Sequence, residues 1–541
     1  MNRYEGTSTT WIRRGCATPP CQARKLAGPL FLGFGVVGAL APLALAHAPP
    51  SRAASVITVS AQQLLDIDSG QLVAQPVVRI VDGVIADVHV RQPGEAVTYD
   101  LGAVTLLPGL IDCHTHLVGG EGLSPFGYLT ETPARAAIEG VANAWATLQA
   151  GFTTVRDLGS RDLADVALRD AIASRRVPGP RMFVAVRSLS VTGGHGDWNE
   201  LPPDVHVQRQ TAVIADGPEG VQRATRENMK WGADWIKILV TGGVMSAGTN
   251  PLQADYTLAE IQAAVSTAKA RGLDVAAHAH GEEGILRAAR AGARSIEHAS
   301  FLSDAAIAEL RRTGAFIVSN PYTNYYILEK GTAGGFQGYE VEKSRQVYQA
   351  KLDSLRRAIG AGIPVAYGTD AGVQPHGING RQLSIYVAAG MTPLQALQSA
   401  TIVAARLLRR EQQLGRLRPG FVGDLVAVRE NPLVNIRTVE APLHVVKDGV
   451  LWWSRPAAAD GQAPQAPAAA KTAVASPGPV GNNGPPRPRP PSPVMGREPA
   501  ATPKAPAAAR PPSPSLAAPA RPQRSPAPRP PAAPQEESVW R

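Results

Sequence analysis

The sequence predicts an α/β fold: a (β/α)8 TIM barrel with a small β-sandwich domain built from both flanks of the barrel. Two observations support this prediction. The middle of the chain alternates short apolar stretches with helical segments, as the parallel strands and helices of a barrel do. The stretches before and after the middle are rich in short, alternating strand patterns. A doubly wound open sheet would show the same alternation and is the alternative fold.

Eight stretches are predicted as the barrel strands, because each is a short apolar run and helical segments separate most of them. In chain order they are residues 105–111, 153–156, 181–186, 235–239, 274–277, 295–296, 315–318 and 364–367. Residues 133–148 and 258–270 are the clearest predicted helices. Eight such units over roughly 300 residues fit one barrel.

Short strands are also predicted on both sides of the barrel. Residues 77–81 and 84–88 flank Asp82-Gly83, a dipeptide typical of a β-hairpin turn. Similar stretches recur within residues 424–452. Because strand-rich segments bracket the long middle, we predict that they form one small β domain together.

The two ends of the chain differ from the middle in charge. The net charge of +10 lies in the ends, with +4 in residues 1–50 and +6 in residues 457–541, so it does not indicate a nucleic-acid-binding body. Arg24-Lys25 precede an uncharged apolar run that ends in Ala44-Leu45-Ala46, the pattern of a secretory signal peptide. The pattern predicts a periplasmic or secreted protein, and an uncleaved membrane anchor is the alternative.

The C-terminal segment is dominated by Pro, Ala, Ser and Arg and has almost no large apolar residues. Such a composition cannot offset the entropy of ordering, so we predict a disordered tail. Its arginines could touch anionic envelope polymers or lipid headgroups weakly, and an inert linker is the alternative. The predicted segments are a signal peptide (1–48), the N-terminal half of the β-sandwich (49–105), the barrel (106–410), the C-terminal half of the β-sandwich (411–456) and the tail (457–541).

Polar side chains gather at the C-terminal ends of the predicted strands, where barrel enzymes carry their catalytic groups. The first strand ends in His114 and His116, which alternation along a strand places on one face. The others are Lys237 in strand four, His278 and His280 after strand five, His298 after strand six and Asp370 after strand eight. Imidazole and carboxylate groups bind metal ions, so their convergence predicts a metal site.

Two residues near these groups need a separate interpretation. Cys113 lies between Asp112 and His114, so it faces away from the histidines, and we expect it to pack rather than ligate. Lys237 lies among apolar neighbours, where an uncompensated ammonium group would be costly. The cost disappears if the neutral amine has reacted with carbon dioxide, because the resulting carbamate offers one oxygen to each of two metal ions.

These motifs resemble those of the amidohydrolase superfamily of metal-dependent hydrolases. The resemblance covers about residues 55–455 and rests on Pro-Gly-Leu-Ile-Asp-Cys-His-Thr-His, Ile-Lys-Ile, His-Ala-His-Gly, Ile-Glu-His and Gly-Thr-Asp-Ala-Gly, in this order. It implies two divalent metal ions. One is held by His114, His116 and Asp370, the other by His278 and His298, and carboxylated Lys237 (N6-carboxylysine) bridges them. His280 is the alternative ligand from strand five and otherwise lines the substrate pocket.

The resemblance also implies the chemistry. Two metal ions would activate water and polarise the scissile carbonyl group. Asp370 would take a proton from that water and pass it to the leaving nitrogen, with His280 as a second candidate catalytic residue. Zinc fits the mixed nitrogen and oxygen ligands best, and manganese, iron or cobalt would also fit.

Within the superfamily, the chain is most similar to the imidazolonepropionase-like and Xaa-Pro dipeptidase (prolidase) group. Gly-Gly-His-Gly at 193–196, the run 237–243 and His-Gly-Ile-Asn at 376–379 carry this likeness. By resemblance, imidazolonepropionase has a one-metal site without the bridging lysine and is not expected outside the cytoplasm, so Lys237 and the export signal favour the peptidase-like branch. A cyclic amide or imidazolone is the alternative substrate. We expect a dipeptide such as Xaa-Pro or, by similarity to ochratoxin-type amide hydrolases, an N-acyl amino acid.

Several further residues are predicted to bind the substrate. They are His195 in its glycine-flanked loop, Tyr322 and Tyr325 after strand seven, His376, and Arg381, which stands where relatives often carry an acidic residue and would suit a substrate carboxylate. Core packing is the alternative for the tyrosines. We also expect a homo-oligomer. A binding protein that retained the fold is disfavoured because all six ligands are present.

Overall fold

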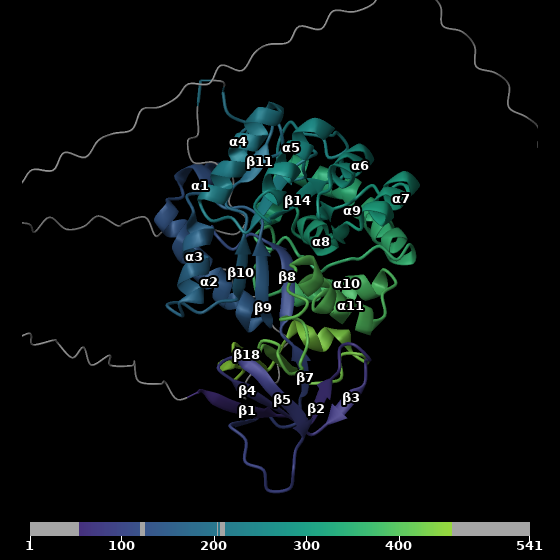
Figure 1. The fold of residues 1–541 in the computed structure, drawn as a ribbon. Coiled ribbons are helices and arrows are strands. Elements are labelled where there is room, and N and C mark those ends of the chain that lie inside the picture. Colours follow the sequence, from purple (N-terminus) through teal and green to yellow (C-terminus); the bar gives the residue numbers. More distant parts are fainter. Residues whose placement is uncertain (1–53, 120–124, 203, 206–210, 457–541) are drawn as a thin grey trace, which may run out of the picture. The chain divides into compact units, whose positions relative to one another are not determined.

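The structure is a computed structural model that describes residues 54–119, 125–202, 204–205 and 211–456. The predicted signal peptide (1–48) and tail (457–541) therefore lie outside the described residues. Within these ranges, no helix has the length and apolar character needed to cross a membrane. The described chain has a β region, made by strands within 56–108 and 425–454, and an α/β region between them (Figure 1).

The α/β region alternates strands and helices as the sequence predicts. Its strands are β8 (Leu110–Thr115), β9 (Phe152–Asp157), β10 (Arg181–Val184), β11 (Ser188–Ser190), β12 (Ala212–Ile214), β13 (Trp235–Leu239), β14 (Asp274–Ala279), β15 (Ser295–His298) and β16 (Phe316–Val318). Its α-helices are α1 (Pro125–Thr130), α2 (Pro133–Gln149), α3 (Ala164–Ala173), α4 (Gly217–Lys230), α5 (Leu258–Lys269), α6 (Glu282–Ala291), α7 (Asp304–Thr313), α8 (Pro321–Lys330), α9 (Gly338–Gly360), α10 (Gln382–Ala388), α11 (Pro393–Ser399) and α12 (Ile402–Leu407). Short 3-10 helices are η1 (Thr332–Gly334), η2 (Asn379–Arg381) and η3 (Ile436–Glu440).

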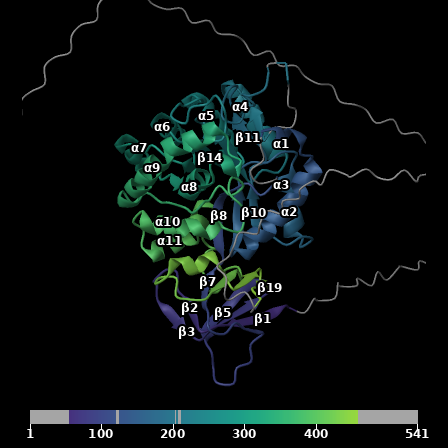
Figure 2. The same cartoon turned by 180° about the vertical axis from the view of Figure 1, so that it is seen from behind.

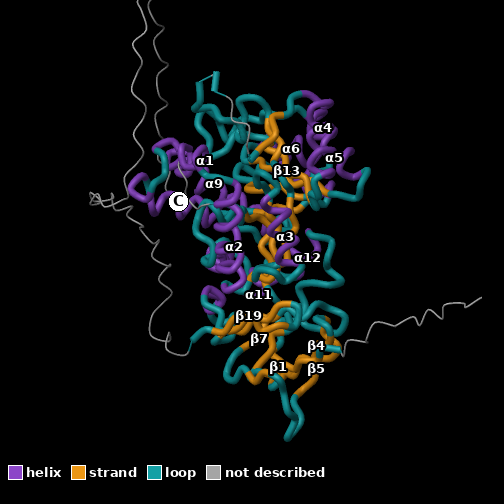
Figure 3. The backbone as a smooth tube through the Cα atoms, turned by 90° about the vertical axis from the view of Figure 1, so that its left-hand side faces the viewer, coloured by secondary structure: helices purple, strands orange, loops and turns teal. Residues whose placement is uncertain are grey.

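The two clearest helix predictions are confirmed, and local sequence explains where these helices begin. Thr132 caps α2 by accepting a hydrogen bond from the backbone N–H of Arg135, and Pro133 occupies the first turn. Thr257 and Glu260 form a reciprocal capping box at the start of α5. Seen from behind and from the side, the helices lie outside the strands of the α/β region (Figures 2 and 3).

The strands of the α/β region form two parallel sheets, ordered β10-β9-β8 and β12-β11-β13-β14-β15-β16. Isolated parallel bridges join Ile317 to Val365 and Thr115 to Ala371, so residues 364–371 run between β16 and β8. These pairings do not by themselves close an eight-stranded barrel, which stays a prediction here. Because strand direction is shared, the C-terminal ends of these strands meet at one edge.

Two strand predictions differ from the structure. The predicted eighth strand, 364–367, exchanges backbone hydrogen bonds with Ile317 on one side and accepts one from Cys113 on the other, but it makes only isolated bridges, and the chain turns soon after it at Asp370, with a φ of 60°. The predicted first strand, 105–111, divides at Gly109, where an added Cβ would lie 2.2 Å from the Thr153 hydroxyl. Residues before this glycine belong to the β region, so the predicted boundary at 105 falls within a strand.

The β region draws strands from both flanks of the α/β region. They are β1 (Val56–Ser60), β2 (Gln63–Leu65), β3 (Leu72–Ala74), β4 (Pro76–Val81), β5 (Val84–Val90), β6 (Tyr99–Asp100), β7 (Thr105–Pro108), β17 (Leu425–Val428), β18 (His444–Lys447) and β19 (Val450–Ser454). One sheet has the order β5-β4-β1-β6 and the other β19-β18-β17-β7-β2-β3, with β17 antiparallel to β7. The yellow-green β18 accordingly lies among the purple strands in Figure 1.

Hairpin geometry and a shared core hold the β region together. Asp82 and Gly83 join β4 to β5 with φ angles of 49° and 82°, the left-handed conformation expected of this turn. Side chains of both sheets, including Ile80 and Leu106, share one buried apolar cluster. The two sheets therefore stabilise each other.

We predict that Arg181→Met destabilises the fold by about 3 kcal/mol. Arg181 on β10 donates to Asp424 over 2.9 Å and also pairs with Asp448, so it ties the α/β region to the β region. Its loss would leave the largely buried Asp424 carboxylate without this cation. Urea unfolding monitored by circular dichroism measures the change. Arg312→Met, which removes a pair between the exposed Arg312 and Glu309 on the same helix, is the control and should change stability little. Equal effects of the two substitutions on stability would contradict the role of Arg181 in linking the two regions.

Candidate functional site

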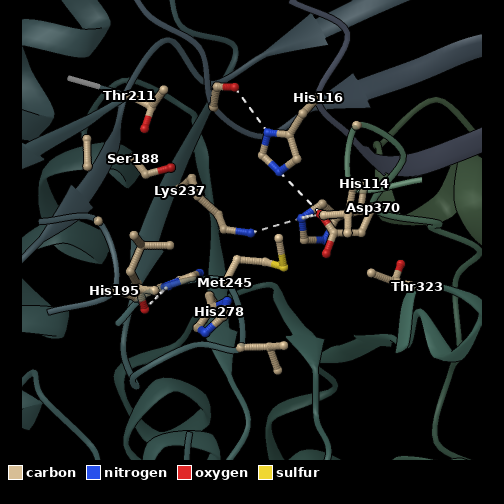
Figure 4. A pocket seen from close by; sticks show the side chains of 18 of the residues that line it. His114, His116, Ser188, His195, Thr211, Lys237, Met245, His278, Thr323 and Asp370 are labelled. Carbon is tan, nitrogen blue, oxygen red and sulfur yellow. Dashed lines mark hydrogen bonds and ion pairs between the residues drawn. The ribbon is translucent and has the colours of Figure 1, made fainter. Parts of the chain in front are cut away.

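A cavity of about 320 Å³ opens where the C-terminal ends of the parallel strands meet. All seven side chains predicted as metal ligands or their alternative line it: His114, His116, Lys237, His278, His280, His298 and Asp370. They come from β8, β13, β14, β15 and the segment after β16. Figure 4 shows several of them pointing toward a common centre. The structure thus brings together groups that are up to 256 residues apart in the sequence.

His114, His116 and Asp370 form one group whose possible ligand atoms lie within 4.8 Å of one another. Asp370 Oδ1 is 3.3 Å from His114 Nε2 and 3.4 Å from His116 Nε2. The other ring nitrogens are already engaged: His114 Nδ1 lies 2.9 Å from Glu297, and His116 Nδ1 lies 3.1 Å from the carbonyl oxygen of Gly159. Both rings therefore turn Nε2 toward Asp370, as ligands of one metal ion would.

His278, His280 and His298 form a second group within the same 4.8 Å limit. His280 and His298 stack with ring centroids 4.6 Å apart, and His278 meets His298 edge-on at 4.5 Å. His280 Nδ1 lies 2.7 Å from the Ser300 hydroxyl. Since both residues of the His-Ala-His motif belong to the group, the geometry leaves the choice between His278 and His280 open.

Lys237 lies next to the first group and is 2% exposed. Its Nζ is 3.2 Å from His114 Nε2, and Figure 4 shows the amine directed toward His114 and Asp370. Burial lowers the pKa of Lys237 to about 8. Burial therefore favours the neutral amine, which is the form that reacts with carbon dioxide.

A buried ion pair behind His114 was not predicted from the sequence. Arg156 on β9 and Glu297 on β15 are both fully buried and lie 2.9 Å apart. Burial would raise the pKa of Glu297, but Arg156 and the hydrogen bond with His114 lower it to about 2. The sequence shows two features of this pair: Arg156 is a charged residue within an apolar strand, and Glu297 is the Glu of the Ile-Glu-His motif. Neither feature identifies the partner, which lies 141 residues away.

Asn320 and Lys351 are further unpredicted residues of the site. Asn320 follows β16 and contacts both His298 and Asp370. Lys351, on α9, is 2% exposed, lines the cavity and donates to Asn320. No sequence signal marks Asn320, because one asparagine after a strand is usual for a turn. A lysine in an amphipathic helix likewise gives no indication that its amine is buried.

Two candidate ligands adopt unusual backbone conformations. His298 has a φ of 70° and Asp370 a φ of 60°, in the left-handed region that non-glycine residues rarely occupy. Such residues cost about 1–3 kcal/mol each and cluster at functional sites. His298 is the last residue of β15, and Asp370 follows the strand-like segment 364–367. The strained backbone at these positions therefore directs both side chains into the cavity.

Of the predicted substrate-binding residues, His195 and His280 line the cavity and the other four do not. His195 lies 4.5 Å from the His278 ring and 2.8 Å from the Ser246 hydroxyl. Tyr322 instead contacts Arg381 and Tyr325, whose side chain is exposed. His376 lies behind β8, with Nε2 3.1 Å from the carbonyl oxygen of His116. Substrate contact by these four stays a prediction.

The predicted packing role of the one cysteine in the described ranges agrees with the structure. Cys113 is fully buried within an apolar cluster and has a free thiol. Burial raises the pKa of this thiol well above its usual range. It is therefore neither a nucleophile nor a ligand in this site.

Comparisons with known proteins agree with this geometry. Residues 105–451 match the model of the Amidohydrolase family. An ochratoxinase from Aspergillus niger is 33% identical over 371 residues, which are 64% of this chain and 75% of that protein. An imidazolonepropionase from Rhizorhabdus wittichii is 26% identical over 409 residues, 69% of this chain and 91% of that protein. A crystal structure of a Xaa-Pro dipeptidase is 35% identical, with a TM-score of 0.69 over 74% of this chain and 100% of that one.

We predict that Gly243→Ala displaces the His195 ring from the cavity. An added Cβ at Gly243 would lie 2.2 Å from His195 Cε1, so the ring must move. Overpacking of this kind typically costs about 1–3 kcal/mol, which thermal unfolding would measure, and a crystal structure of the variant would show the new ring position. Gly338→Ala is the control, because nothing lies within 4 Å of its added Cβ. An unmoved His195 in the Gly243 variant would contradict the prediction.

Proposed function

We propose a specific activity for this chain, which belongs to the amidohydrolase family and is a hydrolase of carbon–nitrogen amide bonds. In this proposal it is an exported enzyme that uses two divalent metal ions and cleaves Xaa-Pro dipeptides or N-acyl amino acids. The observation that carries it is the pair of ligand groups beside the buried amine of Lys237. Export rests on the sequence pattern of residues 1–48, and zinc on the mixed donor set.

The donor set fits the proposed metal ions. In the first group, both histidines have Nδ1 engaged by an oxygen, so Nε2 is the nitrogen left for a metal ion. His280 and His298 in the second group also have Nδ1 within hydrogen-bond distance of an oxygen. Outer hydrogen bonds of this kind orient metal-binding imidazoles. When bound, divalent ions would activate water and polarise the substrate carbonyl group.

Lys237 is proposed to be carboxylated. The neutral amine attacks carbon dioxide, a nitrogen–carbon bond forms as one carbon–oxygen π bond opens, and one proton passes from the nitrogen to solvent water, giving an anionic carbamate. The change places a negative charge and two oxygens at this buried position. Both effects suit a position next to His114, since metal ions there need anionic partners.

Asp370 is the proposed proton carrier. Its Oδ1 faces the histidines of the first group, while Oδ2 accepts a hydrogen bond from Asn320. Burial raises the pKa of this carboxyl group, but the neighbouring His114 and His116 lower it further, so the net shift is downward. Asp370 therefore starts as a carboxylate, accepts the proton of the attacking water and gives it to the leaving nitrogen. His195 and His280 line the cavity, and we propose that they hold the substrate.

The cavity wall supports a substrate with a bulky apolar group. Apolar side chains of one buried cluster line it: Val244, Met245, Ile327, Phe336 and Val373. Burial of such a group against this wall would supply binding energy. An Xaa-Pro dipeptide or an N-acyl aromatic amino acid offers both an amide bond and an apolar group. A cyclic amide is the second candidate, favoured by the relative named imidazolonepropionase.

The experiment that tests the activity is a substrate screen of the zinc-loaded protein. Dipeptides, N-acyl amino acids and cyclic amides are compared at equal concentration, and amide products are measured by mass spectrometry. We expect the highest kcat/KM for an Xaa-Pro dipeptide or an N-acyl amino acid. A clear preference for cyclic amides would favour the second candidate instead.

We predict that Lys237→Ala loses activity by at least about 100-fold, because it removes the carbamate, and that short carboxylates such as acetate or propionate restore some of it. Rescue at fixed metal concentration distinguishes a lost anion from general damage. Lys343→Ala, which removes an amine that instead donates to the carbonyl oxygens of Gly243 and Ser246, is the control and should show no rescue. Full activity of the Lys237 variant without added carboxylate would contradict the bridging role.

We predict that Phe336→Ala lowers kcat/KM for substrates with a large apolar group by about tenfold, with little change for small ones. Phe336 is almost fully buried and lines the cavity. Steady-state kinetics on paired substrates, one bulky and one small, gives the ratio. Phe421→Ala in the β region should leave that ratio unchanged. Equal loss for both substrates would place Phe336 outside the specificity pocket.

A further inference from the structure

Asn320 joins the two groups of candidate ligands through a single amide. This residue follows β16 and is fully buried. Its Oδ1 lies 2.9 Å from His298 Nδ1, in the second group. Its Nδ2 donates to Asp370 Oδ2, in the first group, over 2.9 Å. A change at this one side chain would therefore reach both groups.

Lys351 fixes which way this amide faces. Its Nζ donates to Asn320 Oδ1 over 2.8 Å and to Asn324 Oδ1 over 2.5 Å. The Asp370 carboxylate only accepts, so Nδ2 of the Asn320 amide must face it, and Oδ1 is then the atom that accepts from the Lys351 amine. The two neighbours of the amide thus demand the same orientation.

This orientation decides the state of His298. Because the Asn320 oxygen accepts, His298 Nδ1 must carry the proton of the neutral ring. The lone pair of the ring is then on Nε2. That tautomer is the one with Nε2 free to bind a metal ion.

The same amide also holds Asp370. With Oδ2 occupied by Asn320, Oδ1 is the oxygen that faces His114 and His116. Both ligands that Asn320 contacts have a positive φ, so their backbone conformations are costly and need support from neighbours. Asn320 supplies that support at the side-chain end of each.

We propose that Asn320, oriented by Lys351, is a positioning residue that sets the metal-binding tautomer of His298 and the direction of the Asp370 carboxylate. The inference rests on the proposed use of two metal ions. The inference explains why a buried lysine amine from α9 lies beside a histidine-rich site: the amine helps to hold one amide in a fixed orientation. Asn320 and Lys351 would act on metal affinity without being ligands.

The test is a zinc titration in competition with a chromogenic chelator, which gives stoichiometry and affinity independently of activity. Asn320→Leu removes both contacts, and we expect each zinc to bind about 10–100-fold more weakly. Asn320→Asp keeps acceptors for His298 and Lys351 but cannot donate to Asp370. We expect it to lower strongly the affinity for the zinc ion at His114, His116 and Asp370, and to change little the affinity for the zinc ion at His298. Lys351→Met removes one of the two neighbours that hold the amide in this orientation and should weaken the binding of both zinc ions about tenfold.

The matched control is Ser344→Ala. Ser344 lies on the same helix as Lys351, is fully buried and contacts Asn324, but it touches no candidate ligand. Thermal unfolding of the metal-free variants shows whether each one folds, and the near-isosteric Asn320→Asp keeps the test valid if Asn320→Leu does not fold.

Two results would overturn the inference. Wild-type affinities for both ions in Asn320→Asp and Lys351→Met would do so, and so would an equal loss in Ser344→Ala, since that would reflect helix packing. If the wild-type protein binds fewer than two zinc ions, the proposed function fails, and this inference fails with it. If the wild-type protein binds two zinc ions and the variants bind them equally tightly, only this inference fails.

Discussion

The ion pair between Arg156 and Glu297 is the interaction on which the site depends. Both side chains are fully buried, and breaking such a pair by removing one partner typically costs about 3–5 kcal/mol. Arg156 also donates to the carbonyl oxygen of Cys113 and to the Ser295 hydroxyl, and its guanidinium lies over the Trp235 ring. One cation thus connects β8, β9, β13 and β15 beneath the cavity.

The second carboxylate oxygen of Glu297 carries this order into the chemistry. It lies 2.9 Å from His114 Nδ1, so the pair that joins the strands also orients the first candidate ligand. Asp112 on β8 is a second buried carboxylate that orients a candidate ligand. It accepts hydrogen bonds from the backbone and hydroxyl of Thr369, the residue before Asp370, and from Asn379. Buried polar groups therefore hold the residue that precedes the strained turn at Asp370. The apolar core positions the strands, and these polar contacts direct the side chains at their ends.

The sequence predicted the elements and ligands that depend on local pattern. Strand alternation placed His114 and His116 on one face, and apolar runs located β13 and β14 with their polar ends. It did not predict Arg156, Glu297, Asn320 or Lys351 as members of the site, because their roles arise from contacts between strands and helices far apart in the chain. Tyr322 and Arg381 follow the right strands, yet they contact each other and do not line the cavity. Gly109 looked like the interior of one strand, and only the close approach of Thr153 shows why the chain passes there from one sheet to another.

The most direct measurement is a crystal structure of the zinc-loaded protein with anomalous diffraction data collected at the zinc absorption edge. The account predicts two anomalous peaks in the cavity. One should lie about 2.0–2.2 Å from His114, His116 and Asp370, and the other at the same distance from His298 and either His278 or His280. Density for a carbamate should extend from Lys237 between them. A single peak, or two peaks with an unmodified Lys237 amine, would contradict the account.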